Sequence, residues 1–330
     1  MAKIINLNMA NNNDAVIFGL ENSWELAKNI GLSINKEIHP VTKVTFADGE
    51  RLLSSEITTR NKSVYIICNT AKPVNDNIME LLIFIDSLKR ASAKYITVVM
   101  TYYGYARQDR KAAGRQPISA KLIADLLETA GATKVIAIDL HNPSIQGFFN
   151  IPVDDLRGQF IFSAELRSRK ENFVIVSPDH GGAVRARQLS ELLDHGDEIA
   201  IIDKRRTGPN QSEIMGVLGN VKDKNVVIYD DIIDTGGTII HAVKALKEQG
   251  AKKVIVAATH GLFSKGFDMF ENDKDVDEVI VTDSVNHDHL KNYKKLKILS
   301  LAKFLGLVIE ANINKTSITD VYYAYGQRHK

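Results

Sequence analysis

The sequence has a single cysteine, almost no imbalance of charge and no long apolar run, and each absence excludes a class of protein. Cys68 is the only cysteine among 330 residues, so no internal disulfide can form. It lies in the apolar run 64–69, where we expect a buried thiol, and a reducing compartment fits. No apolar run approaches the ~20 residues that a membrane-spanning helix needs. The N-terminal segment also lacks the apolar core of a signal peptide, so we expect a cytoplasmic protein.

The balance of charges excludes a global affinity for nucleic acid or for a membrane surface. The chain has 42 Lys and Arg residues against 40 Asp and Glu residues, a formal net charge of +2. Without an excess of basic groups, any site for an anion must be local. With 44% hydrophobic and 25% charged residues, the composition is that of a globular protein. The length of 330 residues predicts two domains.

Short β-branched runs alternate with amphipathic helical patterns along the chain. Residues 76–92 show the helical pattern, with Ile78, Leu81 and Ile85 on one apolar face. Strands that are continuous apolar runs, alternating with helices, are typical of parallel sheets covered on both faces. We therefore predict an α/β protein, with strands at 64–69, 96–100, 134–140, 173–179, 198–203, 225–231 and 253–259.

Two segments of the chain resemble each other and favour two similarly built halves. Residues 128–141 and 247–260 each read as a helix end, Gly-Ala, a Lys-Val-Ile strand and a terminal His. Pro and Gly in 151–160 place the boundary near residue 155. We expect domains over 1–155 and 156–330, each a parallel sheet flanked by helices. The last helical segment, 301–312, precedes a strand-like polar tail that we expect to contact the first domain.

The segment DDIIDTGGT, residues 230–238, follows a buried strand and opens an amphipathic helix. Backbone N–H groups in such a Gly-rich turn, with the positive end of the helix, bind phosphate. Its carboxylates suit the 2- and 3-hydroxyls of a sugar. An acidic helix N-terminus without a ligand is the alternative. The segment predicts a loop for a phosphorylated ribose, bound by Asp230, Asp234, Thr235, Gly236, Gly237 and Thr238.

Two further stretches have the composition of nucleotide-binding segments. In 45–53, Phe46, Asp48 and Glu50 alternate and would share one face if extended, so that a ring and two acceptors could bind a base. An Asp-Gly hairpin turn explains this stretch at least as well. In the basic stretch 102–117, Arg107 and Gln108 offer donors for phosphates and a base, and a solvated basic loop is the alternative.

Two other stretches suggest a metal site and a cationic clamp. His141 and Asp179 follow predicted strands, and Mg²⁺, which keeps several waters, would need no more than these two ligands. A His that is merely hydrogen-bonded is the alternative. In 201–213, Lys204 and Arg206 are two apart and would point the same way in an extended segment before a turn-rich stretch. They suggest a clamp for a transferring phosphoryl group, or else a basic surface loop.

Together these stretches resemble the ribose-phosphate diphosphokinase family, the phosphoribosyl pyrophosphate synthetases, in its phosphate-activated bacterial class. The resemblance rests on FADGE, MELLIFIDSLKRASAK, YYGYARQDRK, ETAGATKVIAIDLH, SPDHGGAVRAR, DKRR and DDIIDTGGT, which occur in the family's order and spacing. It implies two type I phosphoribosyltransferase-like domains. It also implies transfer of the diphosphoryl group of ATP to the 1-hydroxyl of ribose 5-phosphate, which gives AMP and phosphoribosyl diphosphate for nucleotide biosynthesis (EC 2.7.6.1).

The resemblance also implies roles for particular residues. Lys204 and Arg206 would be catalytic, with Arg206 also binding ribose 5-phosphate, and His141 and Asp179 would hold Mg²⁺. Family members form hexamers in which the FADGE-like segment completes the ATP site of a neighbouring subunit, so we expect a homohexamer. The ATP-binding positions would be Phe46, Asp48, Gly49, Glu50, Arg107 and Gln108.

One departure from the family pattern and two rival functions stay open at this point. In 111–116, Ala113 and Gly114 replace an Arg and a Ser near the family's regulatory site, which leaves activation by phosphate and inhibition by ADP open. A phosphoribosyltransferase would share DDIIDTGGT, but the duplicated halves and DKRR count against it. A non-catalytic regulatory subunit or sugar-phosphate sensor is the other rival, against which the presence of Lys204, His141 and Asp179 argues.

Overall fold

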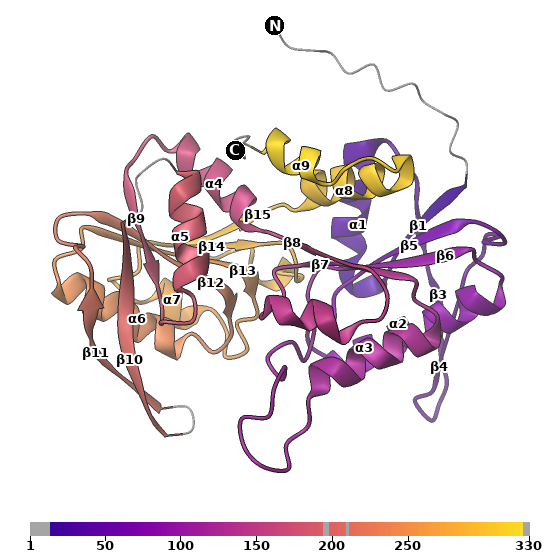
Figure 1. Ribbon diagram of the computed structural model, residues 1–330, viewed down its shortest axis with the longest axis horizontal. Coiled ribbons are helices and arrows are strands. Elements are labelled where there is room, and N and C mark those ends of the chain that lie inside the picture. Colours follow the sequence, from indigo (N-terminus) through magenta and orange to yellow (C-terminus); the bar gives the residue numbers. More distant parts are fainter. Residues whose placement is uncertain (1–13, 194–197, 209–210, 326–330) are drawn as a thin grey trace, which may run out of the picture.

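Two β-sheets form the centres of the two halves of the molecule (Figure 1). The computed structural model describes residues 14–193, 198–208 and 211–325, without the side chains of 205–214. The strands of the first half are β1 (Ala15–Gly19), β2 (Ile38–Pro40), β3 (Thr42–Thr45), β4 (Arg51–Ser54), β5 (Ser63–Cys68), β6 (Tyr95–Met100), β7 (Lys134–Ile138) and β8 (Val153–Leu156). Those of the second half are β9 (Phe173–Ser177), β10 (Ile199–Gly208), β11 (Gln211–Leu218), β12 (Asn225–Ile233), β13 (Lys253–Gly261), β14 (Glu278–Thr282) and β15 (Leu296–Leu299).

The two sheets share one strand order. The first is β2-β1-β5-β6-β7-β8, and the second is β11-β10-β9-β12-β13-β14-β15. If β11 is left out, the six strands of the second sheet follow one another in the same order as the six strands of the first, with the second strand in sequence at the edge and the first strand beside it. Neighbouring strands are parallel except in the β10–β11 hairpin. A separate antiparallel hairpin, β3–β4, projects from the first half.

Helices cover both faces of each sheet. They are α1 (Trp24–Ile34), α2 (Val74–Arg90), α3 (Ser119–Ala130), α4 (Gln159–Ser168), α5 (Ala183–Leu192), α6 (Gly237–Glu248), α7 (Asp268–Glu271), α8 (Ala302–Asn314) and α9 (Thr319–Ala324), with 3-10 helices at Glu21–Ser23, Pro143–Phe148 and Asp288–Leu290. On the first sheet, α2 and α3 cover one face, and α1 and α8 cover the other. On the second, α6 and α7 cover one face, and α4 and α5 cover the other. The predicted α/β class is confirmed, and the seven predicted strands are β5, β6, β7, β9, β10, β12 and β13.

The chain crosses between the halves twice. After β8 completes the edge of the first sheet, α4 packs with α5 on the second sheet. After β15 completes the second sheet, α8 returns to pack against α1 on the first. Figure 1 shows α8 beside α1, with α9 next to α8 on the side of α4. No helix in the described part of the chain is long and apolar enough to cross a membrane.

The segment after α8 is a helix, whereas its sequence was expected to form a strand. The apolar residues Ile318, Val321, Tyr322 and Tyr325 recur at positions i, i+3, i+4 and i+7. Val321 belongs to the cluster that includes α8, and the other three pack against it. The Tyr322 ring lies 4.7 Å from that of Phe160 between centroids. In a helix this spacing places the apolar side chains on the face that covers the cluster. The residues after Tyr325 lie outside the described part of the chain.

The repeated segments 128–141 and 247–260 are not structural counterparts, although the two halves are built alike. By strand order, β13 takes the place of β6, and β14 takes that of β7. His260, near the end of β13, therefore corresponds to Tyr102, which follows β6, and not to His141, which follows β7. The rings of His260 and Tyr102 meet at the contact between the halves, with centroids 5.0 Å apart. A helix-to-strand connection with Gly-Ala occurs at more than one place in this fold, which explains the misalignment.

Candidate active site

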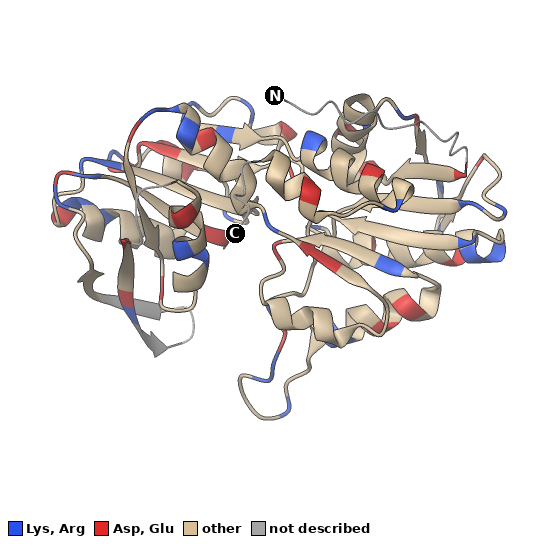
Figure 2. Ribbon diagram, turned by 45° about the horizontal axis from the view of Figure 1, so that its top comes forward, with Lys and Arg blue, Asp and Glu red and all other residues tan. Residues whose placement is uncertain are grey.

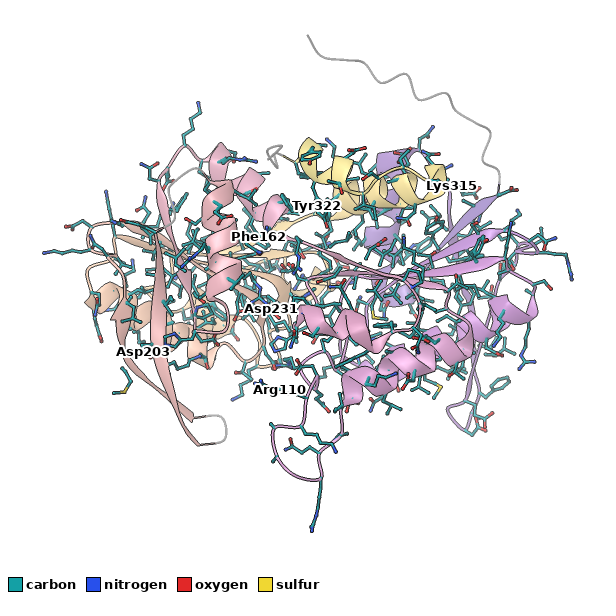
Figure 3. All side chains as sticks on the ribbon, in the orientation of Figure 1. Arg110, Phe162, Asp203, Asp231, Lys315 and Tyr322 are labelled. Atoms are coloured by element: carbon teal, nitrogen blue, oxygen red, sulfur yellow. The ribbon has the colours of Figure 1, made fainter. Side chains whose placement is uncertain are left out.

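A cavity of about 670 Å³ lies at the carboxyl ends of strands from both sheets. Its lining includes residues that follow β7, β9 and β12, together with part of the loop after β6. In the second sheet, β9 and β12 are neighbours, but the chain leaves them toward opposite edges of the sheet. Such a switch point opens a crevice between the connections, where α/β proteins bind ligands. Asp231, which lines this cavity, lies near the middle of the molecule in Figure 3.

A network of charged side chains forms one wall of the cavity. His141 Nδ1 lies 2.8 Å from Asp231 Oδ2. Arg185 Nη1, on α5, lies 2.8 Å from Asp230 Oδ1 and 2.9 Å from Asp231 Oδ1. Asp231 is 3% exposed, and a carboxylate so buried is costly unless a cation and hydrogen bonds compensate it. Arg185 and His141 supply that compensation, one from each half of the molecule.

The adjacent carboxyl groups of Asp230 and Asp231 have pKa values that move in opposite directions. Burial and the neighbouring Asp231 carboxylate raise the pKa of Asp230 well above its usual range. Burial acts on Asp231 too, but the His141 hydrogen bond and the Arg185 charge outweigh it and lower the pKa of Asp231. Asp231 therefore carries the negative charge that holds His141 and Arg185.

A second ion pair joins the two halves across the cavity. Arg107, from the loop after β6, donates from Nη1 to Asp234 Oδ2 at 2.6 Å, and Ser264 Oγ donates to Asp234 Oδ1 at 2.5 Å. Burial opposes ionisation of Asp234, but these two donors outweigh it and lower its pKa. The structure thus brings a residue predicted to bind ATP against one predicted to bind ribose phosphate.

The turn between β12 and α6 has the geometry of a phosphate-binding loop. Gly236 has φ +81°, in the left-handed region, and a Cβ there would lie 2.6 Å from Met269 Sδ and from Phe270 Cζ. A Cβ on Gly237 would meet no atom within 4 Å. No described side chain caps the start of α6, so its first N–H groups are available to an anion.

Known proteins match this chain over both halves. Residues 15–131 match the N-terminal domain of ribose phosphate pyrophosphokinase, and residues 157–293 match the phosphoribosyl transferase domain. Over 316 residues the chain is 55% identical to a ribose-phosphate pyrophosphokinase of Mycoplasmopsis pulmonis (strain UAB CTIP), covering 96% of this chain and 98% of that one. The chain belongs to the ribose-phosphate pyrophosphokinase family.

Other members of this family agree in sequence and in structure. The chain is 48% identical over 294 residues to the ribose-phosphate pyrophosphokinase of Bacillus subtilis (strain 168), covering 89% of this chain and 92% of that one. A crystal structure of phosphoribosylpyrophosphate synthetase from Mycobacterium smegmatis matches with a TM-score of 0.85 and 37% identity, over 92% of this chain and 99% of that one. The family and the fold predicted from the sequence motifs are thus confirmed.

The predicted site residues of this family member divide into those that line the cavity and those that do not. The lining contains Arg107, His141, Asp179, Asp230 and Asp234. The ribose-phosphate turn continues beyond the lining, with Thr235 and Thr238 exposed beside Gly236 and Gly237. Gln108 is exposed, and its Oε1 accepts a hydrogen bond from Ser119 Oγ at 2.6 Å near the start of α3.

The predicted cationic clamp lies in an extended segment, as expected, which is the end of β10 in a β-hairpin. β10 continues to Gly208 and pairs with β11, with Lys204 opposite Ile214 and Arg206 opposite Ser212. Backbone pairing with β11 extends the strand beyond the apolar run that the sequence marked as a strand. Lys204 is not among the described residues that line the cavity. The side chain of Arg206 and residues 209–210 lie outside the described part of the chain.

The predicted adenine-binding segment forms the tip of the β3–β4 hairpin. Phe46 N donates to Glu50 O at 2.8 Å, and Gly49 N donates to Phe46 O at 3.0 Å, so the chain turns here. The expectation that Phe46, Asp48 and Glu50 share a face in an extended segment is wrong, and the Asp-Gly hairpin turn is confirmed. Gly49 has φ +93°, which only a residue without Cβ adopts readily. None of these tip residues lines the cavity.

The sequence interpretation missed residues that the fold brings into the cavity. Arg185 is part of the motif SPDHGGAVRAR, but the sequence patterns predict no role for it. In the structure it is the cation that pairs with both Asp230 and Asp231. The signal that could have found it is the Asp-Asp pair at a buried strand end, which requires a cation nearby. Asn142 and Asp109 also line the cavity and bind each other, Asn142 Nδ2 to Asp109 Oδ2, at 2.7 Å.

The donors in the cavity fit a weakly held Mg²⁺ better than an all-protein metal site. Among the described residues there is no group of three or more His, Cys, Asp or Glu side chains that could hold a metal. His141 and Asp179 line the same cavity, and the Asp231 carboxylate orients the His141 ring in the way that carboxylates orient metal-binding histidines. Few protein ligands suffice for Mg²⁺ because water and phosphate oxygens complete its shell.

Proposed function

We infer that this protein is a ribose-phosphate pyrophosphokinase, which transfers the diphosphoryl group of ATP to ribose 5-phosphate and makes phosphoribosyl diphosphate and AMP for nucleotide biosynthesis. The similarity to family members spans nearly the whole chain. The observation that carries the inference is the cavity itself, where the acids of the ribose-phosphate turn lie with Arg107, His141 and Asp179. A phosphoribosyltransferase would need one such sheet, whereas this cavity is built from two.

We propose that the phosphate of ribose 5-phosphate binds at Thr235–Thr238, on the first N–H groups of α6. Asp230 and Asp234 would accept from the ribose hydroxyls and orient the 1-hydroxyl toward the β-phosphorus of ATP. Catalysis of such an in-line transfer is largely positioning and stabilisation of charge on phosphoryl oxygens. Arg107, Lys204 and Arg206 would supply that charge, with β10–β11 as the arm that brings the last two to the cavity.

We propose that Mg²⁺ binds through His141 and Asp179, with water and substrate phosphates as its other ligands. The bound ion would neutralise phosphate charge during transfer. His141, which follows β7, would hold the ion, and its ring is bound by Asp231 of the second half, which in turn pairs with Arg185. The contact between the two halves therefore sets the position of this ligand.

We propose that the tip residues Phe46, Asp48, Gly49 and Glu50, with Arg107 and Gln108, bind ATP, and that the tip acts on a second copy of the chain. Phe46 is 49% exposed and lies on a hairpin that projects from the molecule, away from the cavity of its own chain (Figure 1). A hexamer, as in the family resemblance, would place one subunit's hairpin at another's cavity. Figure 2 shows Lys and Arg interspersed with Asp and Glu along the ribbon of both halves, so no excess of one sign opposes this assembly.

We further propose that the chain divides near residue 155 and belongs to the phosphate-activated bacterial class. The end of β8 at Leu156 and the start of α4 at Gln159 support this boundary. The class rests on the motifs, and segment 111–116 is where its regulation would differ. There, the backbone N–H groups of Ala112 and Ala113 bind Gln116 Oε1 at 3.1 and 3.0 Å within the loop.

The assay that tests this function uses purified protein with ATP, Mg²⁺ and ribose 5-phosphate. We expect AMP and phosphoribosyl diphosphate to form in equal amounts, and AMP only when the pentose phosphate is present. Binding of ribose 5-phosphate without AMP formation would instead show a sugar-phosphate sensor. Transfer of a phosphoribosyl group to an added base would show a phosphoribosyltransferase.

Replacing His141 with alanine is expected to raise the Mg²⁺ concentration needed for half-maximal activity by ~10-fold or more, since losing one ligand weakens a site that has few. The measurement is a magnesium titration of AMP formation at saturating substrates. The matched control is Asn142→Ala, which removes a neighbouring side chain that also lines the cavity. Equal magnesium requirements in the His141 variant and the parent protein would argue against the ligand role.

A further inference from the structure

The β3–β4 hairpin is attached to the body of its subunit by its base and not by its tip. Leu53, on β4, is buried and belongs to the core of the first half. Toward the tip the other face is open, where Val44 and Leu52 lie opposite each other and are 43% and 45% exposed. The orientation of the tip therefore depends on the contacts that β3 and β4 make with the rest of the subunit.

Glu80 of α2 is the centre of those contacts. It is 7% exposed, and its Oε1 lies 2.8 Å from Arg51 Nη1 and 3.3 Å from Lys43 Nζ. Arg51 is on β4 and Lys43 is on β3, so one carboxylate binds both strands of the hairpin. Arg51 Nη2 also lies 3.1 Å from Asp76, one helical turn before Glu80, and Lys43 also pairs with Glu21.

The register of the hairpin places both cations on the side that meets α2. Thr45 pairs with Arg51, and Lys43 pairs with Leu53, so Lys43 and Arg51 lie on the same face, two positions apart along the hairpin. Arg51 directly follows the turn 46–50. A shift of Arg51 relative to α2 would therefore move the tip directly.

Burying the Glu80 carboxylate costs free energy of folding, and an apolar side chain would pack at this position without that cost. An acid taken out of water is destabilising unless cations pair with it, and apolar residues of similar size often stabilise such a position as well or better. Of the other buried positions of α2, Asn77 donates a hydrogen bond to Ala71 O, and the rest are apolar, namely Ile78, Leu81, Phe84, Ile85 and Leu88. Glu80 therefore serves the hairpin and not the packing of the helix.

We propose that Glu80 is a positioning residue for ATP, because it fixes the β3–β4 hairpin through Arg51 and Lys43 and so aims the tip at the ATP site of a second copy of the chain. This inference rests on the proposed role of the tip in ATP binding. It assigns to Glu80 an effect on the ATP site of the neighbouring subunit, and none on the ribose 5-phosphate site.

The test is the steady-state kinetics of Glu80→Gln in the full-length protein, with its thermal unfolding measured in parallel. Glutamine keeps the size of the side chain and removes the charge that binds two cations. We expect KM for ATP to rise ~10-fold or more, as breaking a buried charge pair typically costs at least that factor, with KM for ribose 5-phosphate unchanged within ~2-fold. The matched control is Asp76→Asn, since Asp76 is exposed and binds Arg51 alone; KM for ATP should change by less than ~2-fold.

Two further variants separate the possible outcomes. Arg51→Gln removes the same ion pair from the side of the hairpin and should raise KM for ATP in the same way. This variant also tests the proposal if Glu80→Gln does not fold. Phe46→Ala tests the tip itself. If Phe46→Ala raises KM for ATP while Glu80→Gln and Arg51→Gln do not, the positioning role is wrong and the ATP site stands. If Phe46→Ala also leaves KM for ATP unchanged, the ATP site at the tip is wrong, and the positioning role with it.

Mixed assemblies test whether Glu80 acts on another subunit. Subunits with Glu80→Gln retain their own Lys204, and subunits with Lys204→Ala retain an intact hairpin. Suppose that each ATP site receives its hairpin from one neighbouring subunit and that the two variants mix in equal amounts. About a quarter of the sites would then combine an intact hairpin with an intact Lys204. We expect activity with a normal KM for ATP to appear after mixing and reassembly. No such recovery, with mixed assemblies shown to form, would overturn the action between subunits.

Discussion

Replacing Lys204 with alanine is expected to lower turnover by ~10²-fold or more, because a lost donor to a developing phosphoryl charge typically costs this much. Binding of ribose 5-phosphate should change little, since the loop that we propose for the phosphate is elsewhere, between β12 and α6. The measurement is kcat for AMP formation together with the affinity for ribose 5-phosphate from a direct binding experiment. A lower kcat at constant affinity is the signature of an interaction made only in the transition state.

The matched control for Lys204 is Lys224→Ala. Lys224 also lies in the second half, but its ion pair with Glu198 is 3.8 Å long and exposed, so it should contribute little. Turnover of this variant should stay within ~2-fold of the parent protein. Near-normal turnover in the Lys204 variant would reject the catalytic role, and a parallel loss of ribose 5-phosphate affinity would assign Lys204 to substrate binding instead.

The substitutions Gly236→Ala and Gly237→Ala should show separately how the loop between β12 and α6 contributes to stability and to the binding of ribose 5-phosphate. At Gly236, the new Cβ would lie 2.6 Å from the buried ring of Phe270, and the residue would have to adopt φ +81°, at a cost of ~1–2 kcal/mol before the clash is counted. We expect a lower melting temperature and a KM for ribose 5-phosphate that rises ~10²-fold or more as the turn rearranges.

At Gly237 the expected result differs in its effect on stability. The new Cβ would meet no protein atom within 4 Å, and alanine favours a helix over glycine by ~1 kcal/mol, so the melting temperature should not fall. KM for ribose 5-phosphate should still rise, because the methyl group would occupy the space through which the phosphate approaches the backbone. Unchanged KM in the Gly237 variant would place the phosphate elsewhere.

Local patterns in the sequence predicted the ribose-phosphate turn and the strands around it. An apolar run, a Gly-rich turn and an amphipathic helix are neighbours in the chain, so their geometry depends on few distant contacts. The same reasoning could not find Arg185 as the partner of Asp230 and Asp231, since 45 and 46 residues separate them and only the strand order brings them together (230 − 185 and 231 − 185). Nor could it place Lys204, whose strand continues because β11 pairs with it.

Patterns with two local solutions needed the tertiary structure to decide between them. Phe46, Asp48 and Glu50 alternate as in a strand, but the pairing of β3 with β4 closes a turn there. The polar tail after α8 forms α9 because Val321 and Tyr322 find an apolar surface to cover. The turn is selected by pairing between two strands that are neighbours in the sequence, whereas α9 is selected by partners as distant as Phe160.

The sequence by itself determined the two-halved α/β architecture, the family and the Gly-rich turn that we propose for the phosphate, because motif order and apolar periodicity are properties of the chain. Only the tertiary structure decided that Asp231 joins His141 to Arg185, that Arg107 meets Asp234 across the two halves, and that Glu80 binds both strands of a distant hairpin. Charge pairs of this kind depend on the meeting of side chains from separate elements, and their strength depends on the burial that the fold creates.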